Sequence, residues 1–124
     1  EFEAETGAKY VTLEELLRVA DVVTMHVPLT PETKEMIGVK ELALMKREAI
    51  LINTARGAVV VEAALAQALR EKRIWGAALD VWEQGGAFDD LDNVILTPHI
   101  ASATGEAREE MTRLAVSNIM AILG

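Results

Sequence analysis

Residues 49–57 read Ala-Ile-Leu-Ile-Asn-Thr-Ala-Arg-Gly, an apolar run that ends in polar and charged residues. Such a run is typical of a buried parallel β-strand that delivers side chains to the carboxyl edge of a sheet. The same pattern recurs twice further along the chain, at 76–81 and at 94–99. Because the carboxyl ends of parallel strands meet at one edge, we expect the polar residues that follow these runs to share a site.

Helical and strand patterns alternate along the rest of the chain. Thr12 and Glu15 have the spacing of a capping box, which predicts the start of a short helix, and Pro28 stops a β-branched strand because it cannot donate to a ladder. The expected strands are 22–27, 49–53, 76–81 and 94–97. One short helix is expected after Tyr10 and another from Thr30-Pro31-Glu32. Further helices are expected over 40–45, 62–72 and 104–123.

This alternation predicts an α/β fold with a parallel sheet of about four strands and flanking helices. The 124 residues are 51% hydrophobic and contain no linker or internal repeat, so we expect a single domain over 1–124. The closing helix carries an apolar stripe on one face. Residues expected to serve packing are Trp75, Trp82, Met111 and Met120.

Composition excludes several classes of function. A net charge of −8 argues against nucleic acid and anionic membrane surfaces as partners. The chain has no cysteine, which removes disulfides and thiolate metal sites and fits a cytoplasmic protein. Its apolar runs are too short to span a bilayer. The acidic start at Glu1, without an initiator Met, suggests that the sequence begins inside a longer protein.

Four motifs together resemble the C-terminal part of the cofactor domain of NAD-dependent D-2-hydroxyacid dehydrogenases, the phosphoglycerate dehydrogenase and glyoxylate reductase group. They lie at 26–30, 53–57, 76–81 and 97–102, and the resemblance covers almost the whole chain. It implies a partial Rossmann-like, doubly wound sheet. The N-terminal unit that binds the pyrophosphate is not in this sequence, since none of the eight glycines forms G-x-G-x-x-G.

Hydride transfer to a 2-keto acid needs a cation for the carboxylate and carbonyl, and an acid for the new alkoxide. Arg56 offers a bidentate guanidinium for the first task, and His99 suits the second because an imidazole ordinarily titrates near neutral pH. The resemblance assigns the same roles to both and also places them at the cofactor. It further places Asp80 at the nicotinamide of NAD, or NADP. The remaining residues that it places around the cofactor are Val27, Pro28, Thr54, Ala55, Ile100, Ala101 and Ser102. We interpret His26 as a core or sheet-edge histidine.

The chain departs from this family at the position that normally pairs with the catalytic histidine. A glutamate followed by proline is usual there, whereas this sequence has Gly85 and Gly86. Losing that carboxylate should cost activity, because it stabilises the protonated imidazole. Glu83 is a weaker catalytic candidate as a substitute. Val61 stands where an acidic or amide residue is usual, which removes a helix N-cap.

In the doubly wound order, we match the strand at 22–27 to the third strand and that at 49–53 to the fourth, which leaves a gap of two strands. Three arrangements could fill it: the two strands pair directly, a second copy supplies strands, or a separate N-terminal half does so. Exposed strand edges promote self-association, so we expect a homo-oligomer.

Two functions remain open. The first is part of an oxidoreductase that acts on a small 2-hydroxy or 2-keto acid and is inactive alone. The alternative is a non-catalytic folding or self-association module derived from such a domain.

Overall fold

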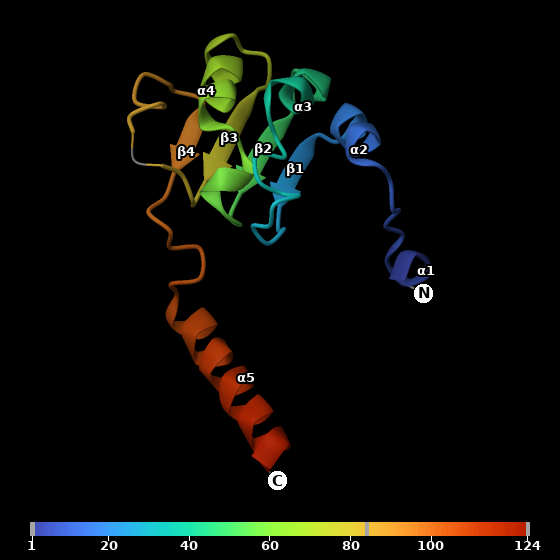
Figure 1. Cartoon of the computed structure of the whole chain (residues 1–124), viewed down its shortest axis with the longest axis vertical. Helices are drawn as coiled ribbons and strands as arrows, with labels where there is room; N and C mark the ends of the chain where they lie inside the picture. The colour runs from blue at the N-terminus through green and yellow to red at the C-terminus, as the bar shows by residue number, and fades with distance from the viewer. Residues whose placement is uncertain (1, 84, 124) are drawn as a thin grey trace.

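A computed structural model describes residues 2–83 and 85–123. The described residues form one sheet of four parallel strands, in the order β1-β2-β3-β4 (Figure 1). The strands are β1 (Val22–Met25), β2 (Ile50–Asn53), β3 (Gly76–Leu79) and β4 (Val94–Leu96). The predicted α/β fold with a parallel sheet is confirmed, and each strand is shorter than the apolar run that predicted it.

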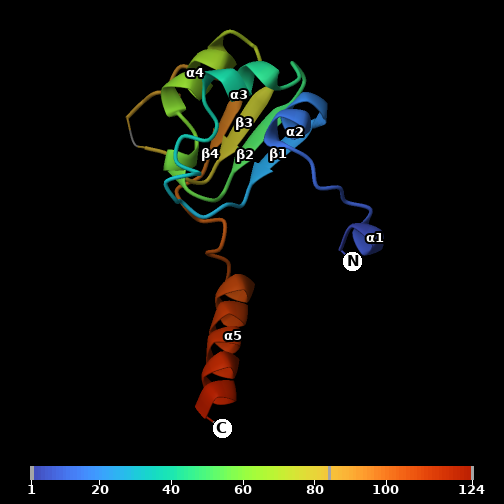
Figure 2. The same ribbon diagram turned by 45° about the vertical axis from the view of Figure 1, so that its right-hand side comes forward.

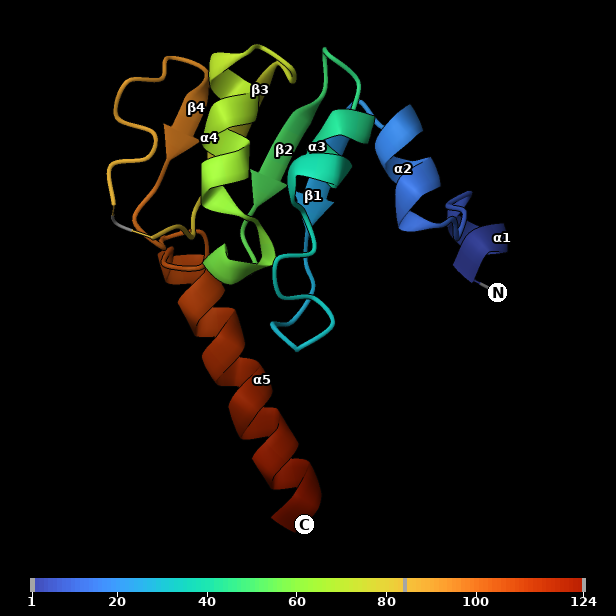
Figure 3. The same cartoon turned by 45° about the horizontal axis from the view of Figure 1, so that its top comes forward.

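Three helices lie in a row over one face of this sheet (Figure 3). The helices of the described chain are α1 (Phe2–Thr6), α2 (Leu13–Val19), α3 (Val39–Leu44), α4 (Glu62–Arg70) and α5 (Gly105–Leu123), with a 3-10 turn η1 (Gly57–Val59). The core lies between the sheet and α2, α3 and α4. Leu17, Leu42 and Leu65 are completely or almost completely buried there. Each such side chain stabilises the fold by about 1.5–3 kcal/mol.

The opposite face of the sheet is not covered by any described helix. Side chains alternate between the two faces of a strand. Val23 and Met25 are buried, whereas Val22 is 51% exposed and Ile95 on β4 is 67% exposed. A shallow groove of about 750 Å³ runs along this face near the amino ends of β2 to β4. The described chain therefore forms two layers.

The predicted gap in the sheet is wrong. β1 pairs directly with β2 in parallel, with Val22 opposite Ile50 and Met25 opposite Asn53. The match of β1 to the third strand was the error, because β1 is the direct neighbour of the Ile50–Asn53 strand. The first of the three arrangements therefore holds, and no strand is needed between them. In the described sheet the unpaired edges are the outer edges of β1 and β4.

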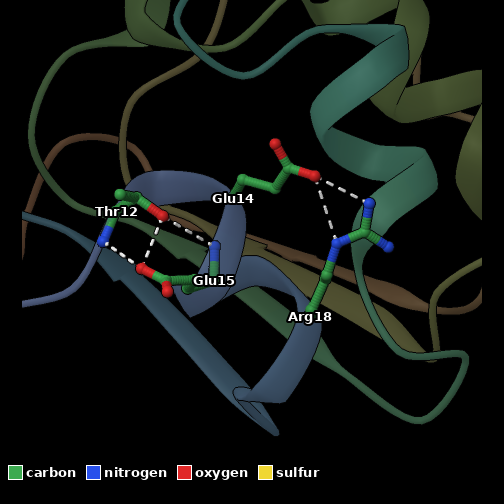
Figure 4. Close-up of polar contacts among 4 residues, drawn as sticks. All are labelled: Thr12, Glu14, Glu15 and Arg18. Atoms are coloured by element: carbon green, nitrogen blue, oxygen red, sulfur yellow. Dashed lines mark hydrogen bonds and ion pairs between the residues drawn. The ribbon is translucent and has the colours of Figure 1, made fainter.

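The predicted capping box at the start of α2 is confirmed (Figure 4). The backbone N–H of Glu15 donates to the Thr12 hydroxyl at 3.2 Å, and the backbone N–H of Thr12 donates to the Glu15 carboxylate at 2.9 Å. Arg18 pairs with Glu14 one turn earlier at 2.8 Å. The two bonds between Thr12 and Glu15 satisfy backbone donors that the helix itself leaves free.

The helix expected at Thr30-Pro31-Glu32 does not form. Residues 31–35 make a hydrogen-bonded turn instead. The backbone N–H of Thr30 donates to the Thr33 hydroxyl at 2.8 Å, and that hydroxyl lies 2.6 Å from the Pro28 carbonyl, to which it donates. Threonine hydroxyls that bond the local backbone compete with helix formation, which explains the turn.

α5 is present where the sequence predicts a helix, but the packing role expected of Met111 and Met120 is wrong. None of its described residues is buried, and the helix points away from the sheet (Figures 1 and 2). Met111 and Met120 are 51% and 61% exposed, and Trp75 is 67% exposed. Trp82 does pack against the core. An amphipathic pattern predicts an apolar face but not the surface that covers it.

Candidate functional site

Three strand ends bring the principal candidates together. Arg56 follows β2, Asp80 directly follows β3, and His99 follows β4. Because β2, β3 and β4 are adjacent and parallel, the turns after them lie at one edge of the sheet. They enclose an open cleft of about 330 Å³, which we call the Arg56–His99 cleft. Its lining residues are Arg56, Gly57, Asp80, Val81, Trp82, Pro98 and His99.

A second hollow of about 560 Å³ adjoins the first and shares Arg56 with it. We call it the Val27 hollow. It is formed by the turns after β1 and β2, the two strands that the sequence predicted to be separated. Its lining residues are His26, Val27, Pro28, Leu29, Thr54, Ala55 and Arg56. Five of the expected cofactor positions, Arg56 among them, therefore line this one hollow.

His26 is exposed and lies just beyond the edge strand β1, so it is not a core residue. Its Nε2 lies 3.0 Å from the Thr24 hydroxyl, which gives the ring a hydrogen-bonding partner at the sheet edge. This position agrees with the sheet-edge interpretation.

The turn after β2 presents Arg56 at the surface. Asn53 is 1% exposed, and its side-chain oxygen accepts a hydrogen bond from the backbone N–H of Ala55 at 3.0 Å. Its side-chain nitrogen donates to the Arg56 carbonyl at 3.0 Å. The guanidinium of Arg56 donates to the Ala55 carbonyl at 2.6 Å. Within the described chain it forms no ion pair with a carboxylate, so its charge is available to an anion.

The turn after β4 is held by the Asp80 carboxylate. One of its oxygens accepts from the Thr97 hydroxyl at 2.6 Å and from the Ile100 N–H at 2.8 Å. The other oxygen accepts from the Ala101 N–H at 2.9 Å. The Thr97 hydroxyl contributes most to holding the Asp80 pKa below its ordinary value, and the two backbone donors and the nearby His99 lower it further.

His99 lies within this turn in an uncommon backbone conformation. Its φ is 56°, in the left-handed region, and its N–H donates to the Asp80 carbonyl at 2.9 Å. The left-handed region costs an L residue roughly 1–2 kcal/mol, so the surrounding bonds must stabilise the turn. The imidazole is exposed and lines the cleft. Among the described residues that line the cleft, Asp80 is the one acidic residue beside His99.

The remaining candidates lie outside the cleft lining. Ile100, Ala101 and Ser102 are exposed and follow His99, and the first two contact Asp80 through their backbone N–H groups. Glu83 is exposed, and its backbone N–H donates to the Glu62 carboxylate. Burial of Glu62 raises the pKa of that carboxyl, and the Glu83 charge raises it further.

The position of Gly85, where the resemblance implies a glutamate, is open. A Cβ built there would meet no atom within 4 Å. Space is therefore not what excludes a larger side chain at this position.

Sequence reasoning missed the roles of Asn53 and Thr97. Both belong to the quoted motifs, but neither was singled out as a site residue. The available signal was a polar residue at the end of an apolar strand, which must find a hydrogen-bonding partner when it is buried.

The described residues lack two kinds of feature. They contain no group of three His, Asp or Glu side chains arranged to hold a metal ion. No helix among them is long and apolar enough to cross a membrane.

Comparison with known proteins gives a consistent match. Residues 1–101 match the family described as D-isomer specific 2-hydroxyacid dehydrogenase, NAD binding domain. A glyoxylate reductase of Thermococcus litoralis is 54% identical over 125 aligned positions, which cover 98% of this chain and 38% of that relative. The chain thus spans well under half the length of the relative.

Solved structures agree in fold. A D-lactate dehydrogenase from Sporolactobacillus is similar with a TM-score of 0.85 and 39% identity, over 99% of this chain and 42% of that one. A D-lactate dehydrogenase from Aquifex aeolicus, complexed with NAD and lactic acid, has a TM-score of 0.82 and 36% identity, over 99% of this chain and 43% of that one.

Proposed function

Because the chain belongs to the NAD-binding domain family of D-isomer specific 2-hydroxyacid dehydrogenases, we propose that it carries the catalytic half of an oxidoreductase site. The proposed reaction is hydride transfer between NAD(H) and a small D-2-hydroxy acid or its 2-keto acid. The observation that supports it most is the placement of Arg56 and His99 on one cleft at the carboxyl ends of adjacent parallel strands.

Arg56 would bind the substrate carboxylate and polarise the carbonyl to be reduced. A guanidinium suits this task because it is always charged and offers a planar pair of donors. The described chain leaves it without a carboxylate partner, and it lies where the cleft and the Val27 hollow meet. It can therefore contact a ligand that extends from one into the other.

His99 would donate the proton that the new alkoxide takes up. Its exposed imidazole faces the same cleft as Arg56. The Thr97 hydroxyl holds the pKa of the adjacent Asp80 below its ordinary value, so an anionic carboxylate lies beside the turn that carries the imidazole. Glu83 stays a weaker candidate for the carboxylate that assists His99, since it does not line the cleft.

Part of the bound cofactor would lie in the Val27 hollow beside Arg56, and the cofactor would supply the hydride. Small and apolar residues line this hollow, among them Val27, Pro28 and Ala55, together with Thr54. Ile100, Ala101 and Ser102 would border the cofactor from the turn after β4. No G-x-G-x-x-G turn occurs in the sequence to hold the pyrophosphate, so we expect weak binding and no turnover by these 124 residues alone.

A chimera tests this proposal. The 124 residues would replace the matching segment of the Thermococcus litoralis glyoxylate reductase, and glyoxylate reduction would be followed by NADH absorbance. We expect turnover, and a loss of about a hundredfold to ten-thousandfold with Arg56→Ala or His99→Ala. Arg47→Ala, which removes an exposed arginine far from the cleft, is the matched control. Unchanged turnover in both cleft variants would refute the assigned roles.

A second candidate is a self-association module. The observation that favours it is apolar surface on two separate elements: Ile95 on the uncovered sheet face, and Ile119 and Ile122 on α5, are 55% to 83% exposed. Contiguous exposed apolar surface commonly marks an interface. We propose a homo-oligomer, or a complex with an N-terminal half, as the form in which these surfaces are covered.

A further inference from the structure

The described chain buries two polar or charged side chains, Asn53 and Asp80, which are 1% and 5% exposed. Both lie at carboxyl ends of neighbouring strands: Asn53 ends β2 and Asp80 follows β3. Burying such groups is unfavourable unless their hydrogen bonds are satisfied. Asn53 forms its hydrogen bonds with the turn that carries Arg56, and Asp80 forms its hydrogen bonds with the turn that carries His99.

Asn53 uses both ends of its amide on the turn that carries Arg56. The oxygen accepts from the Ala55 N–H and the nitrogen donates to the Arg56 carbonyl, both at 3.0 Å. Neither aspartate nor leucine could make both bonds, because the first cannot donate when ionised and the second has no polar atom. The backbone position of Arg56 thus depends on an amide at position 53.

Asp80 forms hydrogen bonds with residues that precede and follow His99 in the sequence. Its carboxylate accepts from Thr97 before the histidine, and from Ile100 and Ala101 after it. The Asp80 carbonyl accepts from the histidine N–H itself at 2.9 Å. These bonds hold His99 at a φ of 56°, which L residues seldom adopt without support.

The two turns are also joined to each other. The backbone N–H of Asp80 donates to the carbonyl of Asn53 at 3.0 Å, one step beyond the last paired residues of β2 and β3. The buried side chains therefore sit on one continuous segment of sheet, and the exposed Arg56 and His99 take their positions from it.

We propose that Asn53, and Asp80 together with Thr97, are positioning residues that fix Arg56 and His99 in relation to each other before any ligand binds. The inference rests on the proposed function for the identity of the reacting pair. It differs from the role that the family resemblance implies for Asp80, because it assigns the carboxylate to the chain's own turn. Such preorganisation matters because small displacements of catalytic groups reduce rates strongly.

The test uses NMR on the intact chain, whose two histidines give separate ring signals. Thr97→Val removes the hydroxyl donor at nearly constant shape, and Thr97→Ser restores a hydroxyl. We expect Thr97→Val to shift the His99 ring signal and to reduce the hydrogen-exchange protection of the Ile100 and Ala101 amides about tenfold. Thr97→Ser should retain most of the original pattern.

Thr24→Val is the matched control, because the Thr24 hydroxyl contacts His26 rather than His99. It should move the His26 ring signal and leave His99 unchanged. Asn53→Leu should perturb the Ala55 and Arg56 amides. Asp80→Asn, which keeps one carbonyl oxygen, should weaken the turn around His99 further than Thr97→Val does.

Unchanged His99 signals and unchanged protection at 100 and 101 in folded Thr97→Val would overturn the proposal for Asp80 and Thr97. If Asp80→Asn or Asn53→Leu fails to fold, the Thr97→Val and Thr97→Ser pair still decides it. In the chimera, the same pair should lower and restore kcat with little change in KM. The NMR result does not depend on turnover, so an inactive chimera would count against the proposed function alone.

Discussion

The Asp80 carboxylate accepts three hydrogen bonds from its own chain, and these donors favour its ionised form. Its pKa in the folded protein is therefore lowered, with the Thr97 hydroxyl as the largest cause. The stability that these bonds add is fully present above the pKa of an unfolded aspartate, about 4. It is lost as the pH falls through the lower pKa of the folded state.

We therefore expect Thr97→Val to raise the Asp80 pKa toward its ordinary value. Acid unfolding should then begin at a higher pH than in the parent chain. With a less lowered pKa, the Asp80 carboxylate is protonated, and loses its hydrogen bonds, at a higher pH. The side-chain carboxyl carbon signal of Asp80, followed by NMR against pH, measures this directly. Thr97→Ser should behave like the parent, and equal midpoints for Thr97→Val and the parent would contradict the account.

Among the elements, α4 begins without a side-chain cap. Val61 occupies the N-cap position with an extended backbone, φ −76° and ψ 99°, and no side-chain hydrogen bond to the first turn. The absence of a cap agrees with the sequence prediction at this position. Val61 also packs against the core, so a replacement must keep its branched shape.

Val61→Thr should stabilise the domain, because a hydroxyl in that position can accept from a free N–H of the first turn. A threonine cap contributes about 1 kcal/mol relative to an uncapped residue. Urea unfolding should show a higher midpoint with an unchanged slope. Val61→Ala is the control that removes packing without adding a cap, and it should lower the midpoint. A lower midpoint for Val61→Thr would mean that burying the hydroxyl outweighs the cap.

The sequence predicted the positions of helices and strands better than it predicted which strands pair. The four strands, α2 and the helices at 39–44, 62–70 and 105–123 follow from local periodicity and capping. The pairing of β1 with β2 did not, because strand order depends on contacts between residues distant in sequence. The turn after Thr30 was missed because threonine hydroxyls bond the backbone there in place of a helix.

The same limit applies to the cleft. Arg56, Asp80 and His99 could be predicted to meet, since a parallel sheet places its strand ends together. The functions of Asn53 and Thr97 could not, because they depend on hydrogen bonds within turns. The left-handed backbone of His99 could not be predicted either, because most histidines do not adopt it and it depends on the bonds within the turn.

At the scale of the whole molecule, helices cover one face of the sheet and leave the other open, while α5 extends from the body (Figures 1 and 3). The last ten described residues of α5, 114–123, contain no charged side chain. This apolar end and the uncovered face are therefore the surfaces on which association would act.

We expect copies of the chain to associate through both the apolar end of α5 and the uncovered face of the sheet. Ile119→Glu on α5 and Ile95→Glu on β4 should each weaken it at least about tenfold, since burying an unpaired carboxylate in an apolar contact is costly. Sedimentation equilibrium over a range of concentrations measures the effect. Val39→Glu, on the exposed surface of α3, is the control. A mass equal to one chain at every concentration of the parent would rule out the oligomer.

The strand order β1-β2-β3-β4 repeats the order of the strands in the chain. Each new strand can therefore add to the edge of the strand made just before it. During synthesis, domains generally fold as units, and those nearer the N-terminus fold first. In this sheet every pairing therefore joins strands that are consecutive in the chain, from the strand before Arg56 to the strand before His99.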